Sequence, residues 1–388
     1  MSFCPFIETA NIDMENLSRT AVKETVYEVH IADLHFGAID PETEYNILRN
    51  QFLSRISSMR KLDIVSVNGD IFDRKFMSNS DAVYYAIKFI DELVGICRAH
   101  NATLVLISGT PSHDSNQLKL FYHYQHDKTV DVRVITLPQM QWIKGIKVLC
   151  IPEMHGYPEE DYQKYLYNDW CDQIFGHMTV KGAVYGDNVG TGRLFDIEDF
   201  LRSRGPIFSG HIHVPGNFIH DFYYTGSPIR YKFGEEQTKG FMVCVFDPNS
   251  RQYYTELIPI DSFTYTTIDM VDIINDPKGV IEYINDIKEK KKIDHIKVRF
   301  QYIVDGANKV VITNYYHNRS DVKLEFKDNQ QQALEKLEEE QKEQGELYSF
   351  LSDSSITDEE KFCRYVNIQE GHEFITVDKL KEILEDGL

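Results

Sequence analysis

The sequence is short of basic residues and has no grouped cysteines. Its 388 residues include 41 Lys and Arg against 61 Asp and Glu, a formal net charge of −20. This excludes a protein coated in basic surface, so binding of nucleic acid would need local basic patches, bound cations or a partner. The six cysteines are scattered without a C-x-x-C pair, which indicates neither a disulfide framework nor a zinc site.

Long apolar runs are also missing. No stretch reaches the ~18 apolar residues that a membrane-spanning helix requires. The N-terminal stretch MSFCPFIETANIDMEN has early acids and no long apolar core, unlike a signal peptide. We therefore expect a cytoplasmic protein with no membrane partner. Hydrophobic residues make up 42% of the chain, enough for a packed core, and the length favours two or three domains.

Strand-like and helix-like segments alternate early in the chain, and strands dominate later. This pattern predicts an α/β fold, a two-sheet sandwich flanked by helices. Strands are expected at 26–32, 62–68, 103–108, 130–137, 141–144, 147–151, 173–175 and 206–209, and helices at 46–59 and 80–100.

The pattern changes after about residue 262. Strands at 265–270 and 295–304 and a helix at 279–290 predict a small α+β unit, and the chain then becomes acidic, with helices at 358–365 and 376–384. We expect four segments: an N-terminal extension (1–25), an α/β domain (26–261), a small α+β domain (262–326) and a helical tail (327–388).

Aspartates and histidines follow several of the apolar strands. They form Asp33-Leu34-His35, Gly69-Asp70, Gly176-His177 and Gly210-His211-Ile212-His213. Parallel strands bring such residues to one edge of a sheet. A two-metal site requires this set, because two cations ~3.5–4 Å apart share a carboxylate and bind further imidazoles and carboxylates. The two oxygens of Asp70 can bridge two ions, and ligands without a thiolate favour manganese, iron or zinc over copper(I).

The third strand ends in Gly109-Thr110-Pro111-Ser112-His113-Asp114. His113 could stabilise charge on a phosphoryl oxygen or protonate a leaving oxygen. The alternative is a structural histidine that caps the following helix or bonds Asp114.

The motif order D-x-H, G-D-x-x-D, H-D, G-H and G-H-x-H resembles that of the calcineurin-like metallophosphoesterases. More narrowly, Gly176-His177 with Val180-Lys181-Gly182-Ala183, and Thr225-Gly226-Ser227-Pro228-Ile229-Arg230 with Phe233-Gly234-Glu235, look like the SbcD-type nuclease subunit. These subunits, including the bacteriophage recombination endonuclease subunits, work with an SMC-like ATPase in DNA repair. The resemblance covers about residues 26–250 by motif, and by layout it extends to the end of the chain.

The resemblance implies a role for each motif residue. Asp33, His35, Asp70 and His213 would hold one divalent ion, and Asp70, His177 and His211 the second. The ions would be Mn²⁺, with Mg²⁺ as the alternative, and His113 would contact the scissile phosphate. The family usually has asparagine before this histidine as a ligand, whereas this chain has Ser112. Ser112, water, Asn116 or Gln117 could fill the position, and the second ion would bind more loosely.

The resemblance also implies partners. The chain would be a metal-dependent DNA exonuclease or endonuclease in recombination, repair or replication, present as a homodimer within a heterotetramer and acting in the host cytoplasm if encoded by a bacteriophage. The small domain would cap the active site and touch DNA through Lys288, Lys290, Lys291 and Lys292, although a solvated helix end explains these lysines equally well. The tail would pack on the coiled coil of the ATPase.

Two other functions remain open from the sequence. One is a phosphatase for small substrates, or a cyclic-nucleotide phosphodiesterase, of the same fold. The other is a DNA-binding scaffold subunit with weakened catalysis, for which Ser112 leaves room.

Overall fold

The computed structural model describes residues 24–153, 170–185, 188–189, 194–200, 203–271, 276–327, 355–370 and 375–386. The chain divides into two compact units, Met1–Thr267 with Asn285–Lys297, and Ile268–Ile284 with Val298–Leu388. Most of the expected N-terminal extension and the first part of the tail lie outside the described residues.

The first unit contains a six-stranded sheet in the order β16-β15-β1-β2-β3-β4. Strands β1 to β4 are parallel, and β15 and β16 extend the sheet in antiparallel fashion beside β1. The strands are β1 (Val26–Ile31), β2 (Ile64–Asn68), β3 (Thr103–Ile107), β4 (Asp131–Ile135), β15 (Gly240–Phe246) and β16 (Tyr253–Pro259).

A second six-stranded sheet has the order β13-β14-β12-β7-β6-β5. Its four central strands are parallel, with an antiparallel strand at each edge. The strands are β5 (Gln139–Ile143), β6 (Ile146–Ile151), β7 (Gln173–His177), β12 (Ile207–Gly210), β13 (Gly216–Ile219) and β14 (Phe222–Tyr224).

The remaining short elements of this unit connect these strands. They are β8 (Thr179–Val180), β9 (Val184–Tyr185), β10 (Asn188–Val189), β11 (Leu194–Phe195) and the 3₁₀ segments η3 (Ser115–His126) and η4 (Ile197–Phe200).

Buried apolar side chains from both sheets meet in one cluster, which includes Ile64 and Val105 from the first sheet and Val148 and Phe208 from the second. Burial of such side chains is the main stabilising contribution in a fold of this size. The central strands have near-continuous apolar sequences because both of their faces are covered.

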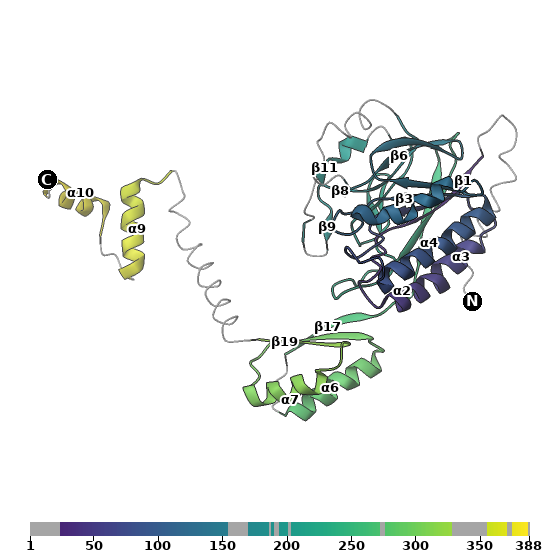
Figure 1. Cartoon of the computed structure of the whole chain (residues 1–388). Helices are drawn as coiled ribbons and strands as arrows, with labels where there is room; N and C mark the ends of the chain where they lie inside the picture. The colour runs from purple at the N-terminus through teal and green to yellow at the C-terminus, as the bar shows by residue number, and fades with distance from the viewer. Residues whose placement is uncertain are drawn as a thin grey trace. The chain divides into compact units, whose positions relative to one another are not determined.

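Helices cover the other face of the first sheet (Figure 1). A continuous helical segment comprises α2 (Pro41–Leu48), the π-helical η2 (Arg49–Leu53) and α3 (Ser54–Ser57), and it packs beside α4 (Asp81–His100). It begins five residues before the expected position because the Asp40 carboxylate accepts the Thr43 N–H and Pro41 occupies the first turn. The expected α/β class, with sheets flanked by helices, is confirmed.

A three-stranded sheet, β17-β18-β19, accompanies helices α6 and α7. The elements are β17 (Tyr265–Met270), α6 (Pro277–Lys290), β18 (His295–Phe300), α7 (Gly306–Tyr316) and β19 (Val322–Phe326). The sequence did not predict α7 or β19. The described tail contains α9 (Asp358–Glu370) and α10 (Val377–Asp386), which agree with its two expected C-terminal helices. Among the described residues, no helix has the length and apolar character needed to cross a membrane.

Candidate metal centre

The backbone at three strand ends adopts an unusual conformation. Asp33 and His35 follow β1 with φ of 51° and 50°, Asp70 follows β2 with φ of 53°, and His211 follows β12 with φ of 84°. Residues other than glycine seldom adopt this left-handed conformation, which costs ~1–2 kcal/mol per residue. Such strain persists where the surroundings enforce it, often at functional sites.

Neighbouring strand ends approach so closely that glycine is required. A Cβ atom at Gly109 would overlap the Asp70 carboxylate, and one at Gly69 would overlap the His177 ring. The Asp33 N–H donates to the Gly69 carbonyl at 3.0 Å, which fixes the end of β1 to the end of β2. The glycines therefore let side chains from several strands share one buried space.

Asp33, His35 and His213 form the first group of potential metal ligands. One potential ligand atom from each lies within 4.8 Å of those of the other two. The Nε2 atoms of His35 and His213 are 3.0 Å apart. Both carboxylate oxygens of Asp33 accept the His211 N–H, at 3.0 and 3.2 Å, which ties this group to the next one.

Asp70, His177 and His211 form the second group, within the same 4.8 Å limit. His177 Nε2 lies 3.3 Å from Asp70 Oδ2 and 3.1 Å from His211 Nδ1. The far nitrogen of His177, Nδ1, donates to the Asn68 carbonyl at 2.8 Å, which fixes the ring orientation. All three residues of this group are buried, and a main-chain carbonyl at the end of β2 holds the His177 ring in place.

A single oxygen of Asp70 faces both groups. Oδ2 lies 3.3 Å from His177 Nε2 and 3.9 Å from His35 Nε2. Oδ1 instead accepts the Thr110 N–H at 2.6 Å. The sequence predicted that Asp70 can bridge two ions, and this geometry places Oδ2 toward both groups.

The histidines differ in charge. Burial lowers the pKa of His35 and of His211 to about 3, so both are neutral imidazoles, the form that binds metals. Burial would also lower the pKa of His177, but the carboxylates of Asp70, Asp33 and Glu153 outweigh it and raise that pKa to about 10.

The carboxylates of Asp33, Asp70 and Glu153 together outnumber the one histidine whose pKa is raised, and this excess of negative charge favours a bound cation. Burial alone would raise the pKa of Asp70, yet His177 and His35 hold it well below its ordinary value. The donor atoms are imidazole nitrogens and carboxylate oxygens that converge, without a thiolate, and this set fits divalent ions such as manganese, iron or zinc. These buried residues could hold a metal ion, and a bound ion would displace the proton from His177.

His113 lies next to the first group. One of its ring nitrogens is within 4.8 Å of ligand atoms of His35 and Asp70, and its ring centroid is 4.8 Å from that of His35. Its Nδ1–H donates to the Asp73 carbonyl, which leaves Nε2 as the other ring nitrogen available for contact. His113 is half-buried, so it borders the buried groups and the solvent.

Comparison with known proteins adds a viral relative to these observations. No protein-family model matches the sequence. A protein of Invertebrate iridescent virus 6 named "Putative phosphoesterase 244L" is 24% identical over 229 residues, which are 58% of this chain and 77% of the viral protein. A crystal structure aligns with 60% of this chain and 99% of its own, at 12% identity and a TM-score of 0.38, a likeness too weak to bear on the fold.

Ser112 is exposed, whereas Thr110, two residues earlier in the same loop, faces the second group. The Thr110 hydroxyl is 3.1 Å from Asp70 Oδ2 and 3.4 Å from His177 Nε2. Asn116 is also exposed, and the amide of Gln117 bonds main-chain groups of Phe76, Arg74 and His113. None of the three side chains suggested by the sequence is placed to complete the second group.

Three supporting residues were not predicted as part of the site. The Glu235 carboxylate accepts from His213 Nδ1 at 2.8 Å, and the buried Lys239 ammonium donates to the His213 carbonyl at 2.7 Å. The Asp114 carboxylate accepts main-chain N–H groups of Gly109 and Asp70 at 2.8 and 2.9 Å. Glu235 belongs to the Phe233-Gly234-Glu235 motif, and its place in that motif could have indicated a role at the site.

The four lysines lie at the end of α6 and in the turn after it. Lys290, Lys291 and Lys292 are exposed, and Lys290 is ion-paired with Asp286 at 2.7 Å. Cations at a helix C-terminus are favoured by the helix dipole. Their contact with DNA therefore stays a prediction.

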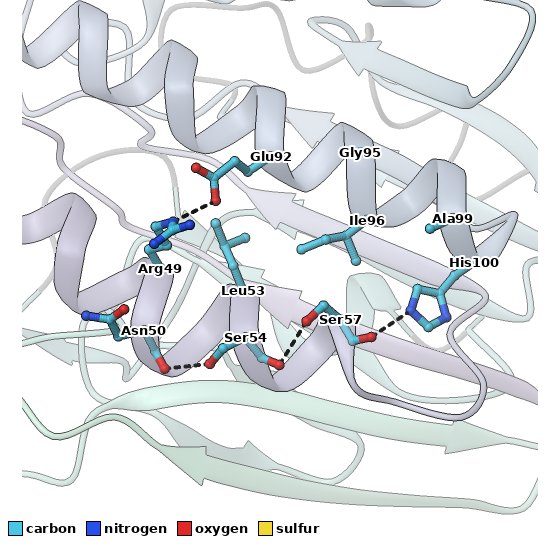
Figure 2. Close-up of a pocket in the computed structure, with 10 residues that line it drawn as sticks. All are labelled: Arg49, Asn50, Leu53, Ser54, Ser57, Glu92, Gly95, Ile96, Ala99 and His100. Atoms are coloured by element: carbon cyan, nitrogen blue, oxygen red, sulfur yellow. Dashed lines mark hydrogen bonds and ion pairs between the residues drawn. The ribbon is translucent and has the colours of Figure 1, made fainter.

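A pocket in the described surface lies elsewhere, between α4 and the η2–α3 segment (Figure 2). Arg49 pairs with Glu92 there at 3.1 Å, and His100 donates to the Ser57 carbonyl at 3.2 Å. None of the aspartates or histidines of the two groups lines this pocket. This pocket is therefore separate from the candidate metal centre.

Proposed function

We propose that this chain is a two-metal phosphodiesterase with the calcineurin-like metallophosphoesterase fold. The observation that carries the proposal is the position of Asp70 Oδ2, which faces His177 on one side and His35 on the other. A carboxylate shared between two groups of ligands is the central requirement of a two-metal hydrolase. The viral relative, named as a phosphoesterase, supports the same class of reaction.

The residues have separate roles in this proposal. Two divalent ions, Mn²⁺ or Mg²⁺, would stabilise charge on the attacking and leaving oxygens of the phosphodiester. His113 acts on the substrate, because its Nδ1 is engaged by the Asp73 carbonyl and Nε2 is left to contact a phosphoryl oxygen or protonate the leaving oxygen. Asp114 holds the backbone of Gly109 and Asp70, which positions both ends of the site.

The substrate we propose is DNA, with cleavage as an exonuclease or endonuclease. Support comes from the resemblance of the segments at 176–183 and 225–235 to the SbcD-type nuclease subunit. The exposed lysines after α6 offer a local basic patch on a chain with a net charge of −20. The additional segments beyond residue 262 argue against a phosphatase for small substrates.

The direct test is hydrolysis by the purified chain in Mn²⁺. We expect cleavage of labelled single-stranded or gapped DNA and of bis(p-nitrophenyl) phosphate, a diester, with little cleavage of p-nitrophenyl phosphate, a monoester. EDTA should abolish the activity and added Mn²⁺ restore it. Faster cleavage of the monoester would favour the small-substrate phosphatase, whereas DNA binding without cleavage would favour the scaffold subunit.

We further propose that the segment 262–326 is a capping domain and that the tail, 327–388, docks on the coiled coil of an SMC-like ATPase in a complex with two copies of each chain. Helix α9 exposes the aromatic side chains of Phe362 and Tyr365, at 50% and 44% of their surface. Burial of such side chains on a partner helix would remove them from water.

Truncation before residue 327 tests this docking. The shortened chain should keep its metals and cleave simple DNA substrates, but lose co-purification with the ATPase and any ATP-dependent stimulation. The double variant Phe362→Ser/Tyr365→Ser in the full chain should weaken the interaction in the same direction. Unchanged binding of the ATPase by the truncated chain would place the contact in another domain.

A further inference from the structure

We infer that Glu153 is a ligand of the second metal group and supplies the donor that Ser112 does not. Glu153 follows β6 directly after Pro152, and its side chain is 7% exposed. Its Oε2 lies 3.7 Å from His211 Nδ1. This inference rests on the proposed metal centre and deepens it by naming a further residue of that centre.

The decisive detail is which nitrogen of His211 the carboxylate approaches. Nδ1 of His211 also lies 3.1 Å from Nε2 of His177, so it is the nitrogen that faces the second group. Glu153 therefore approaches the nitrogen of His211 that belongs to the second group. Its carboxylate is not within 4.8 Å of all the donor atoms of that group, so it would move toward the ion on binding. Ligand bonds of about 2.1 Å place two donor atoms of one ion roughly 3–4 Å apart, and the 3.7 Å separation falls in this range.

Glu235 provides a contrast within the same site. It bonds Nδ1 of His213, whereas Nε2 of His213 faces His35. A carboxylate on the far nitrogen orients the ring and increases its basicity. Glu235 is thus a positioning residue, whereas Glu153 lies on the near side and has the position of a ligand.

Charge supports the same assignment. With Glu153, the two groups contain three carboxylates, from Asp33, Asp70 and Glu153, which offset more of the charge of two divalent ions than two carboxylates do. An added carboxylate ligand raises affinity for hard divalent ions such as Mn²⁺ and Mg²⁺. The second ion should therefore bind tightly, contrary to the looser binding that Ser112 suggested. The Thr110 hydroxyl remains a hydrogen-bond donor to Asp70.

Metal binding by the full chain tests the inference without an activity assay. We would titrate the apo protein with Mn²⁺ by calorimetry, measure bound manganese after dialysis, and record the electron paramagnetic resonance signal of coupled manganese pairs. The wild type should bind two ions per chain. Glu153→Gln keeps the size of the side chain and removes its charge, so it should bind one ion normally and the second at least tenfold more weakly, with loss of the coupled signal.

Two further variants make the result interpretable. Asp172→Asn is the matched control, because Asp172 is a buried carboxylate at the other end of β7 that accepts the Lys147 N–H at 2.8 Å. It should keep both ions. Glu153→Asp keeps the charge and should retain more of the second affinity than Glu153→Gln. Two ions bound with unchanged affinity by Glu153→Gln would overturn the inference alone, whereas no Mn²⁺ binding by the wild type would overturn the proposed metal centre as well.

Discussion

The two metal groups share Asp70 but are held in place by different means. In the second group, His177 is part of β7, and its ring is fixed by the main-chain carbonyl of Asn68. In the first group, His213 lies in a loop after β12 and depends on the side chains of Glu235 and Lys239. One group is therefore built into the sheet, and the other relies on a charged network that a single substitution can break.

Asp70→Asn should have the largest effect, because it alters the residue common to both groups. The asparagine oxygen can still accept the Thr110 N–H, so the fold should be retained. Loss of the charge shared by two cations should abolish binding of both ions and reduce cleavage to background. Calorimetry with Mn²⁺ and the diester assay measure the two effects. Near-normal metal content in this variant would refute the assignment of the site.

The sequence was sufficient for the residues that end apolar strands beside glycines. Asp70, His177 and His211 were indicated in this way, and the structure places them close together because parallel strands end at the same edge of a sheet. Glu153 also follows an apolar strand, β6, but it lies beside no glycine and in no family motif, so the sequence does not single it out.

Other features could not be predicted from local patterns. The exposure of Ser112 depends on the path of the loop after β3, which places the hydroxyl of Thr110, not that of Ser112, against Asp70. The role of Glu235 depends on a contact across 22 residues. Helix α7 was not predicted because its apolar and polar residues are poorly separated onto two faces of the helix. Its strong local signal is the N-cap Asp305.

His113→Ala distinguishes a role of His113 at the substrate from a role as a metal ligand. If His113 acts on the phosphate, the variant should bind both ions normally and lose ~10²-fold or more in kcat. His123→Ala is the matched control, because His123 is an exposed histidine of η3. Weaker binding of one ion, with activity rescued by excess Mn²⁺, would instead make His113 a ligand of the first group, with His35 and Asp70.

Glu235→Gln should affect the first group alone. Loss of the charge on the far nitrogen of His213 should weaken one ion by about 10- to 100-fold, the usual range for partners of metal-binding histidines. The second ion should be unchanged, which is the reverse of the result expected for Glu153→Gln. The matched control is Glu236→Gln, since Glu236 is the adjacent exposed glutamate. Equal loss of both ions in Glu235→Gln would show that the two groups are not held independently.

Glu28→Gln should change the free energy of unfolding but leave metal binding by both groups intact. It therefore has the smallest effect on the comparison between the two groups. Glu28 is fully buried in β1 and lies 3.2 Å from His30 Nε2, and neither residue belongs to a metal group. Burial raises the pKa of Glu28 to about 8 from an ordinary value of 4.5. The folded protein therefore keeps this carboxyl protonated at a pH where the unfolded chain has released the proton.

The contribution of Glu28 to stability is thus fully present below pH ~4.5 and is lost as the pH rises toward about 8. Gln cannot titrate, so the variant should be more stable than the wild type at pH 8.5 by up to ~5 kcal/mol, because the shift of the Glu28 pKa from 4.5 to about 8 is worth ~1.4 kcal/mol per unit. The gain should shrink at pH 6. His30, whose pKa burial lowers to about 3, titrates in both proteins and largely cancels from the difference. Urea unfolding at the two pH values measures the free energies, and Mn²⁺ titration should still give two ions. A gain that is independent of pH would mean that Glu28 is ionised in the folded protein.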